Sequence, residues 1–148
     1  MRQILDAVTL TAKKAGLRAT LKQNRAHLSP EERTRASRTI LRTLLSLDEV
    51  GTARTVFSYI SHGNEVDTRA LLQNFLDKGV TLAVPKIFPG KGMIAVTFTR
   101  WEDLVPGVLG ILTPSGDAPC TGPFDIVITP GLGFTVRIFS TPLKAEEP

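Results

Sequence analysis

The feature that most constrains the fold is a strand–helix–strand pattern in the middle of the chain. Thr55–Ile60 is rich in β-branched and aromatic residues, which predicts a buried strand. A polar turn then leads into a helix predicted from about Asp67 to Lys78, with Gly79 as its C-terminal cap. Val80–Val84 predicts a second strand, which we expect Pro85 to end. Two strands joined in this way pair in parallel through a right-handed crossover, so an α/β fold is expected.

Two helices are predicted before this unit. The first covers residues from about 11 to 27, because leucines recur there at helical spacing. The second begins after Ser29, where a capping serine, a proline and Glu32 form a capping box. This second helix is expected to run to about Leu47. It is expected to bury four apolar side chains, Ile40, Leu41, Leu44 and Leu45.

Two further strands are predicted after the unit, at Met93–Phe98 and Phe124–Thr129. The residues from 101 to 123 contain four prolines, so that segment is expected to be mostly loop. The predicted architecture is α/β: a single three-layer α/β/α domain with a mainly parallel sheet.

The composition is that of one globular domain, with 148 residues, 42% apolar and 22% charged. The apolar runs are too short to span a bilayer, and the N-terminus lacks a signal pattern, so no membrane association is expected. The single Cys120 excludes an internal disulfide and fits a reducing compartment, so we expect a cytoplasmic location. Cys120, His27 and His62 have no recognisable ligand spacing, and no metal site is predicted.

Positive charge is concentrated in residues 13–42, which hold half of the eighteen basic residues. Such a field attracts anions, including nucleotide phosphates and polyglutamate tails. Lys14, Arg18 and Lys22 lie four residues apart on one helix face, where they could clamp a triphosphate. A solvated basic stripe explains the same pattern. No aromatic residue interleaves with this helix, so no specific nucleic-acid binding is expected.

Ligands of open α/β sheets bind beyond the carboxyl ends of the strands. Beyond Ile60 lies Glu65, whose carboxylate could accept paired hydrogen bonds from an amino-pyrimidine or pterin-like ring. The alternative is that Glu65 and Asp67 simply sit in the first turn of the following helix, where the helix macrodipole favours carboxylates. Lys86 is most simply an exposed, solvated lysine. Gly131 and Gly133, after the last strand, most simply form a tight turn.

Several short segments stand in a fixed order between residues 14 and 134. They are Lys14–Arg18, Arg25, Leu28–Glu32, Tyr59–Ile60, Asn64–Thr68, Val84–Lys86, Gly110–Ile111, Pro114 and Asp125–Phe134. Together they resemble the 5-formyltetrahydrofolate cyclo-ligase family. The resemblance implies conversion of 5-formyltetrahydrofolate to 5,10-methenyltetrahydrofolate with ATP and Mg²⁺, in one-carbon folate metabolism. It also implies that Lys14 and Arg18 bind the ATP phosphates and that Ile60 and Glu65 line the folate pocket, while the catalytic residues stay unknown.

The resemblance ends at Phe134. The family continues with a glycine-rich loop and a segment that supplies a magnesium ligand, whereas residues 135–148 contain no glycine, tyrosine or aspartate. We therefore expect a cyclo-ligase-like domain over residues 1–134, a divergent tail at 135–148, an incomplete C-terminal part of the fold, and impaired turnover. The alternative is a non-catalytic folate- or anion-binding protein derived from the same fold. Missing cover on the last strand also predicts self-association.

Overall fold

The computed structural model describes residues 2–134, and the tail predicted at 135–148 lies outside the described residues. The chain divides into two compact units, one of residues 24–130 and one that joins residues 1–23 to the segment from Gly131 onward. The single domain predicted over residues 1–134 stays a prediction.

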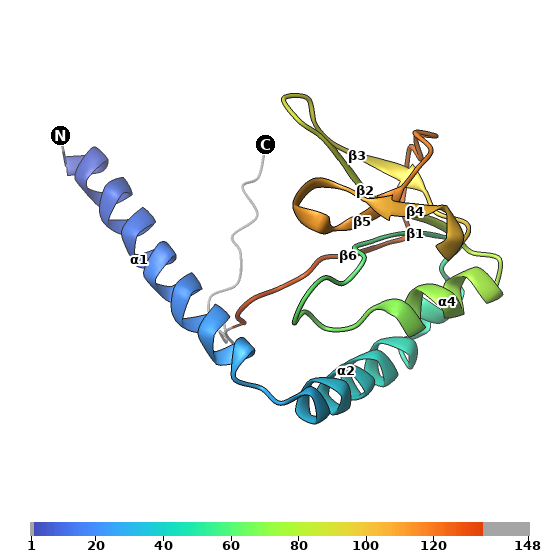
Figure 1. The fold of residues 1–148 in the computed structure, drawn as a ribbon, viewed down its shortest axis with the longest axis horizontal. Helices are drawn as coiled ribbons and strands as arrows, with labels where there is room; N and C mark the ends of the chain where they lie inside the picture. The colour runs from blue at the N-terminus through green and yellow to red at the C-terminus, as the bar shows by residue number, and fades with distance from the viewer. Residues whose placement is uncertain (1, 135–148) are drawn as a thin grey trace, which may run out of the picture. The chain divides into compact units, whose positions relative to one another are not determined.

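The first unit contains most of α1 (Arg2–Ala26), the blue helix of Figure 1. The predicted helix is confirmed, although it begins well before residue 11. Two of the leucines that predicted it are exposed, Leu10 at 53% and Leu17 at 59%. The backbone at Gly133 packs against the side chain of Leu21, so closely that an added Cβ would overlap it. A larger residue at this position would force the Leu21 side chain to move.

The second unit begins with α2 (Pro30–Leu45). The predicted capping box is present: Glu32 N–H donates to Ser29 Oγ at 3.2 Å, and Ser29 N–H donates to Glu32 Oε2 at 2.8 Å. Leu41 is buried as predicted, but Ile40 is 47% exposed, so its predicted burial is wrong. Successive side chains of an α-helix point about 100° apart around its axis. Ile40 therefore lies off the buried face of the helix on which Leu41 lies. A short helix that was not predicted, α3 (Asp48–Thr52), follows.

The centre of the second unit is a four-stranded sheet in the order β3-β2-β1-β6 (Figure 1). Its strands are β1 (Thr55–Ser58), β2 (Thr81–Phe88), β3 (Gly92–Thr97) and β6 (Ile126–Ile128). β1 pairs in parallel with both β2 and β6, while β2 and β3 pair antiparallel. The helix between β1 and β2 is α4 (Arg69–Asp77), which confirms the predicted parallel crossover. Gly79 has φ +70°, as its predicted place at the end of that helix requires.

β2 does not end at Pro85, as the sequence predicted, but continues to Phe88. The last residue of β2 that pairs with β1 is Ala83, whereas the pairing with β3 runs on and sets Pro85 opposite Ala95. A proline cannot donate a ladder hydrogen bond, and it is tolerated where one neighbouring strand has ended. Pro85 therefore lies just beyond the pairing with β1, and it does not end the strand.

The segment from 101 to 123 is more ordered than its prolines suggested. Two short strands, β4 (Leu104–Pro106) and β5 (Leu112–Pro114), pair antiparallel, flanked by two turns of 3₁₀ helix, η1 (Trp101–Asp103) and η2 (Val108–Gly110). Pro106 and Pro114 each stand at the last position of a strand. Prolines at strand ends cost few ladder bonds, and so the prediction of a mostly irregular loop is wrong for this hairpin.

The core of residues 24–130 forms where α2, α3 and α4 meet the sheet. Its buried members are Leu41, Val50, Ala53, Val56, Ile60, Leu71, Leu72, Phe75, Leu82, Val84, Val96 and Phe98. The predicted α/β class with a mainly parallel sheet is confirmed. Among the described residues, no helix is both long and apolar enough to cross a membrane.

Candidate functional site

An apolar pocket of about 180 Å³ lies where β1 ends and β2 approaches its own end. Its walls come from the end of β1, the turn after it, β2, β3, the β4–β5 hairpin and the end of β6. The lining residues are Tyr59, Ile60, Glu65, Pro85, Ile87, Met93, Val108, Ile111, Leu112, Thr113 and Pro130. This is the edge where open α/β sheets hold ligands. Both residues that the family resemblance assigned to the substrate, Ile60 and Glu65, are in this lining.

Ile60 is 7% exposed and belongs to the hydrophobic core, so it joins the pocket to the core of the unit. It follows the last two buried positions of β1, Val56 and Ser58. A side chain in this position is held by packing on several sides, and it gives the pocket a fixed apolar floor.

Glu65 lies in the turn between β1 and α4 and is half-buried. Its Oε2 accepts a hydrogen bond from the backbone N–H of His62 at 3.0 Å, and its own N–H donates to the His62 carbonyl at 3.3 Å. Within residues 2–134, its second carboxylate oxygen accepts no hydrogen bond. The turn therefore fixes the Glu65 carboxylate and leaves one oxygen for a ligand.

The alternative reading, in which Glu65 and Asp67 sit in the first turn of the helix, is wrong for both residues. α4 begins at Arg69, four residues after Glu65. The carboxylate that serves the helix start is that of Asp67, whose Oδ1 accepts a hydrogen bond from the Arg69 N–H at 2.9 Å. An Asp side chain is short enough to bond the backbone two residues on, which Glu65 cannot do from its place in the turn.

Tyr59 was not identified as a site residue from the sequence, except as part of a family segment. Its hydroxyl donates to the Val66 carbonyl at 3.2 Å, which bridges the turn that carries Glu65. Burial raises the pKa of Tyr59, and the neighbouring Glu65 carboxylate raises it further. The phenol therefore stays neutral, and it supports the turn as a hydrogen-bond donor.

The sequence analysis also did not identify the wall of the pocket that the β4–β5 hairpin forms. Thr113 is 9% exposed, and its Oγ1 donates to the Pro85 carbonyl in a long hydrogen bond of 3.5 Å. The neighbouring walls are apolar and come from Val108, Ile111 and Leu112. The prolines in this segment predicted a loop, and the alternation of apolar and polar residues that marks a strand is hard to recognise over only three residues.

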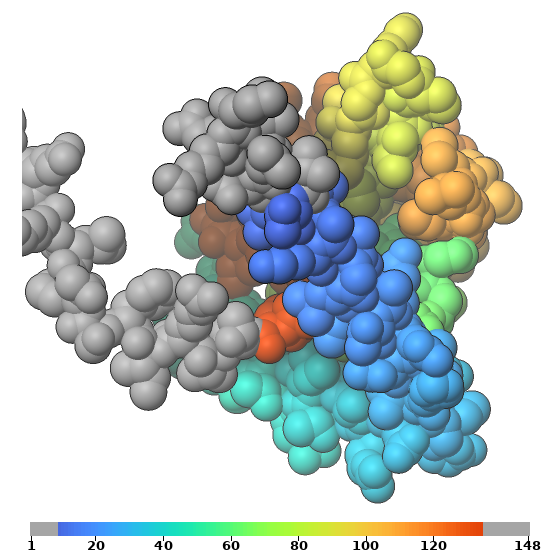
Figure 2. Space-filling view, turned by 90° about the vertical axis from the view of Figure 1, so that its left-hand side faces the viewer, coloured from blue at the N-terminus to red at the C-terminus, as the bar shows by residue number. Residues whose placement is uncertain are grey.

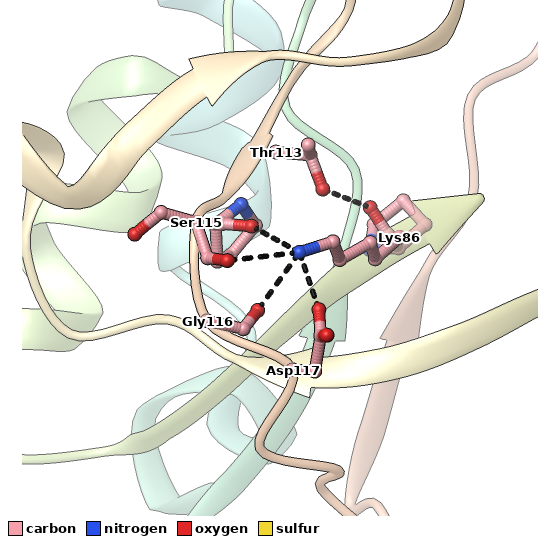
Figure 3. A network of polar contacts seen from close by, with 7 residues as sticks. Lys86, Thr113, Ser115, Gly116 and Asp117 are labelled. Carbon is pink, nitrogen blue, oxygen red and sulfur yellow. Dashed lines mark hydrogen bonds and ion pairs between the residues drawn. The ribbon is translucent and has the colours of Figure 1, made fainter. Parts of the chain in front are cut away.

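Lys86 is not the exposed lysine that the sequence suggested. Its side chain is only 15% exposed, and its Nζ donates to three successive carbonyls, those of Pro114 (2.8 Å), Ser115 (3.1 Å) and Gly116 (3.1 Å). The Asp117 carboxylate forms an ion pair with the same Nζ (Figure 3). Sequence reasoning could not find this arrangement, because three of the four acceptors are backbone atoms and all four come from residues far along the chain.

The two residues assigned to ATP, Lys14 and Arg18, lie on α1. They are four residues apart on a continuous helix, so they share one face. Both are exposed, and within residues 2–134 neither forms an ion pair. Figure 2 shows α1 in blue with side chains at the surface. Two unpaired cations at this spacing are available to an anionic ligand.

A larger pocket, of about 420 Å³, opens between α2 and the turn before α4. It is more polar than the apolar pocket, and it places Arg33 and Arg38 together with Glu65 and Asp67. Two cations and two carboxylates offset one another, so this pocket has no clear preference for an anion. The apolar pocket is the better candidate for a ring-shaped ligand.

Among residues 2–134, no group of three or more His, Cys, Asp and Glu side chains is arranged to hold a metal ion. Cys120 is a free, half-buried thiol.

Comparison with known proteins identifies the chain's relatives. A sequence profile of the 5-formyltetrahydrofolate cyclo-ligase family matches residues 10–137. The mouse (Mus musculus) protein named 5-formyltetrahydrofolate cyclo-ligase is 30% identical over 139 residues, which cover 88% of this chain and 68% of the mouse protein.

Two solved structures resemble the fold. The NMR structure of the Aquifex aeolicus 5,10-methenyltetrahydrofolate synthetase matches with a TM-score of 0.69 and 29% identity, over 84% of this chain and 68% of that protein. A 5,10-methenyltetrahydrofolate synthetase from Mycoplasma pneumoniae matches with a TM-score of 0.51 and 22% identity, over 59% of this chain and 55% of that protein, and supports the fold alone. The chain belongs to the 5-formyltetrahydrofolate cyclo-ligase family.

Proposed function

We propose that this chain binds 5-formyltetrahydrofolate and converts it to 5,10-methenyltetrahydrofolate in an ATP-dependent reaction. The observation that carries the proposal is the pocket at the ends of β1 and β2, in which Ile60 and Glu65 meet in a chain of this family. Family membership supports the reaction, and the size and lining of the pocket support folate as its ligand.

The volume of the pocket and the unbonded oxygen of Glu65 support a folate ring as the ligand. Pockets that hold whole ligands usually enclose roughly 300–1,000 Å³, so a pocket of about 180 Å³ fits a flat ring with the rest of the molecule outside. The amino-pyrimidine part of a pterin presents paired donors, and the free oxygen of Glu65 is an acceptor whose charge strengthens such bonds. Ile60, Ile87 and Leu112 supply apolar contacts on the ring.

ATP fits the cations of α1. Lys14 and Arg18 would hold its phosphates, because an ammonium and a guanidinium on one helix face can each form charge-assisted bonds with phosphate oxygens. When bound, ATP supplies the phosphoryl group that activates the formyl oxygen for ring closure. Mg²⁺ that travels with nucleotide phosphates needs only one or two carboxylates from the protein, and no described residue is assigned to it.

We also propose that turnover is slow. Residues 135–148 contain no glycine, whereas the family pattern places a glycine-rich loop after Phe134. Backbone N–H groups of such loops bind phosphate oxygens closely because no side chain intervenes. The absence of glycine from residues 135–148 supports weaker ATP binding than the family pattern implies.

The second candidate is a folate-binding protein without catalysis. One observation favours it: among the described residues, those that line the apolar pocket lie between Tyr59 and Pro130, in the part of the chain that precedes the divergent tail. Folate binding could therefore persist where the nucleotide site does not.

Two linked measurements decide between the candidates. Calorimetric titration of the purified chain with 5-formyltetrahydrofolate tests binding, and near-ultraviolet absorbance of the methenyl product in the presence of ATP and Mg²⁺ tests turnover. Binding with ATP-dependent product supports the enzyme. Binding without product supports the binding protein, and the absence of both from a folded sample contradicts the proposal.

Two further properties are proposed. The single thiol, Cys120, suits a reducing compartment, and we propose a cytoplasmic location. β6 is an edge strand of the sheet within residues 24–130, and its Val127 is 57% exposed, so we propose weak self-association through this edge. Sedimentation velocity at several concentrations tests the association, and a single monomeric species at all of them contradicts it.

A further inference from the structure

Lys86 holds a segment of chain that belongs to another part of the fold. Its Nζ lies within 2.8–3.1 Å of the carbonyl oxygens of Pro114, Ser115 and Gly116, and Asp117 completes the group (Figure 3). The lysine comes from β2, and the residues that it binds follow β5 directly. One side chain therefore joins the central sheet to the end of the hairpin.

This arrangement depends on positive charge. Three successive carbonyl groups direct the negative ends of their dipoles toward one point, and these ends repel one another unless a cation lies between them. An ammonium has three N–H donors, which matches the three carbonyls, and Asp117 adds a fourth, charged acceptor. With a side chain only 15% exposed, the Lys86 charge is partly shielded from water, and its interactions are stronger for that reason.

The same segment forms a wall of the apolar pocket. Leu112 and Thr113 line the pocket and lie directly before Pro114, the first residue that Lys86 binds. Pro85 and Ile87, on either side of Lys86, line it as well. Side chains alternate along a strand, so Lys86 points away from the face that Pro85 and Ile87 present to the pocket. The ammonium therefore fixes the pocket wall from behind.

We propose that Lys86 is a positioning residue for the folate ring: it holds residues 114–117 against β2 and thereby sets the position of Leu112 and Thr113 in the pocket. This inference depends on the proposed folate site. Lys86 acts through these neighbours rather than on the substrate, because its Nζ is fully occupied by the four oxygens.

The test compares four proteins in two measurements. Lys86→Met keeps most of the length of the side chain and removes the charge, and Lys86→Arg keeps the charge. Lys91→Met removes an exposed lysine from the neighbouring β2–β3 turn as a control. The dissociation constant for 5-formyltetrahydrofolate is measured by calorimetry. Amide hydrogen exchange of residues 112–118 is measured without ligand, so it reports on the segment even if folate does not bind.

We expect Lys86→Met to bind folate about tenfold more weakly than the wild-type chain and to exchange faster across residues 112–118. Lys86→Arg restores binding to within about threefold, and Lys91→Met matches the wild-type chain in both measurements. We expect ATP affinity to be unchanged in all variants. This result would show that Lys86→Met alters only the pocket wall and does not disrupt the fold as a whole.

Unchanged folate binding or unchanged exchange in a folded Lys86→Met protein overturns the inference. Should that variant not fold, Asp117→Asn replaces it: loss of the carboxylate alone raises exchange across residues 112–118 by a smaller factor, and no change overturns the inference. A wild-type chain that binds no folate refutes the proposed function instead, while the exchange measurement still decides whether Lys86 holds the segment.

Discussion

The backbone N–H of His62 donates to Glu65 Oε2 at 3.0 Å, and this bond holds the one carboxylate of the apolar pocket in place. The bond uses one oxygen and leaves the other for a ligand. A pocket whose remaining walls are mainly apolar thus contains a fixed acceptor at one position. Such an arrangement orients a ring by its donor edge.

Glu65→Gln is expected to weaken binding of 5-formyltetrahydrofolate about tenfold or more. The amide oxygen would accept the His62 bond, which leaves the NH₂ group facing ligand donors, and a charged hydrogen bond contributes roughly 1.5–3 kcal/mol. Calorimetric titration measures the change. Glu102→Gln, an exposed carboxylate outside the pocket, is the matched control and should bind like the wild-type chain. Equal affinities for the two variants would remove Glu65 from the site.

Lys14→Ala and Arg18→Ala are each expected to raise the KM for ATP about tenfold and to leave folate affinity unchanged, because each removes one charge-assisted bond to phosphate. The neighbouring Lys13→Ala is the control, since an adjacent residue points in another direction around the helix. Steady-state kinetics, or direct ATP binding if turnover is too slow, gives the comparison. The assignment fails if all three variants have the same affinity for ATP.

Gly107→Ala is expected to destabilise the chain by about 1–3 kcal/mol and to weaken folate binding. A Cβ at Gly107 would lie 2.8 Å from Thr113 Cγ2 and 2.9 Å from the Ile111 carbonyl oxygen, so the pocket wall would have to shift. Urea unfolding measures stability. Gly51→Ala meets no atom within 4 Å and is the control, expected to be neutral or slightly stabilising. Equal unfolding midpoints for the two variants would contradict the packing at Gly107.

Asp125 is expected to make the stability of the fold decrease at acidic pH. Hydrogen bonds from the backbone N–H groups of Arg54 and Thr55, at 2.8 and 2.9 Å, hold the pKa of Asp125 below its ordinary value. Because the folded state favours the ionised form, the contribution is complete above the unfolded pKa of about 3.9 and is lost as pH falls through the lower folded pKa.

Asp125→Asn should therefore lower the melting temperature at neutral pH, and the difference from the wild-type chain should shrink below about pH 4. Thermal melts at a series of pH values follow this trend. A difference that stays constant from neutral to acid pH would show that the Asp125 charge contributes nothing.

The sequence predicted the parallel core of the fold because the signals for that core are local. β-branched residues in Thr55–Ile60 and the glycine at position 79 determine conformation within a few residues, and the structure follows both. The continuation of β2 beyond Pro85 could not be predicted from such local signals. Whether a proline ends a strand depends on which neighbour is paired at that point, and the pairing is a property of the whole sheet.

The site was predictable only in part, for the same reason. Glu65 follows a strand end, and both it and Ile60 belong to family segments that could be identified in the sequence. The hairpin wall around Thr113 and the environment of Lys86 involve residues about thirty positions apart, joined through backbone carbonyls that carry no sequence signature. Chemistry that depends on backbone atoms becomes visible only once the chain has been folded.

The most direct measurement is the absorbance of the methenyl product when the purified, folded chain is given 5-formyltetrahydrofolate, Mg²⁺ and ATP, beside a sample without ATP. We expect product to form slowly and only with ATP, and Glu65→Gln to need more folate for the same rate. Absence of ATP-dependent product from a folded wild-type chain would contradict the proposed reaction.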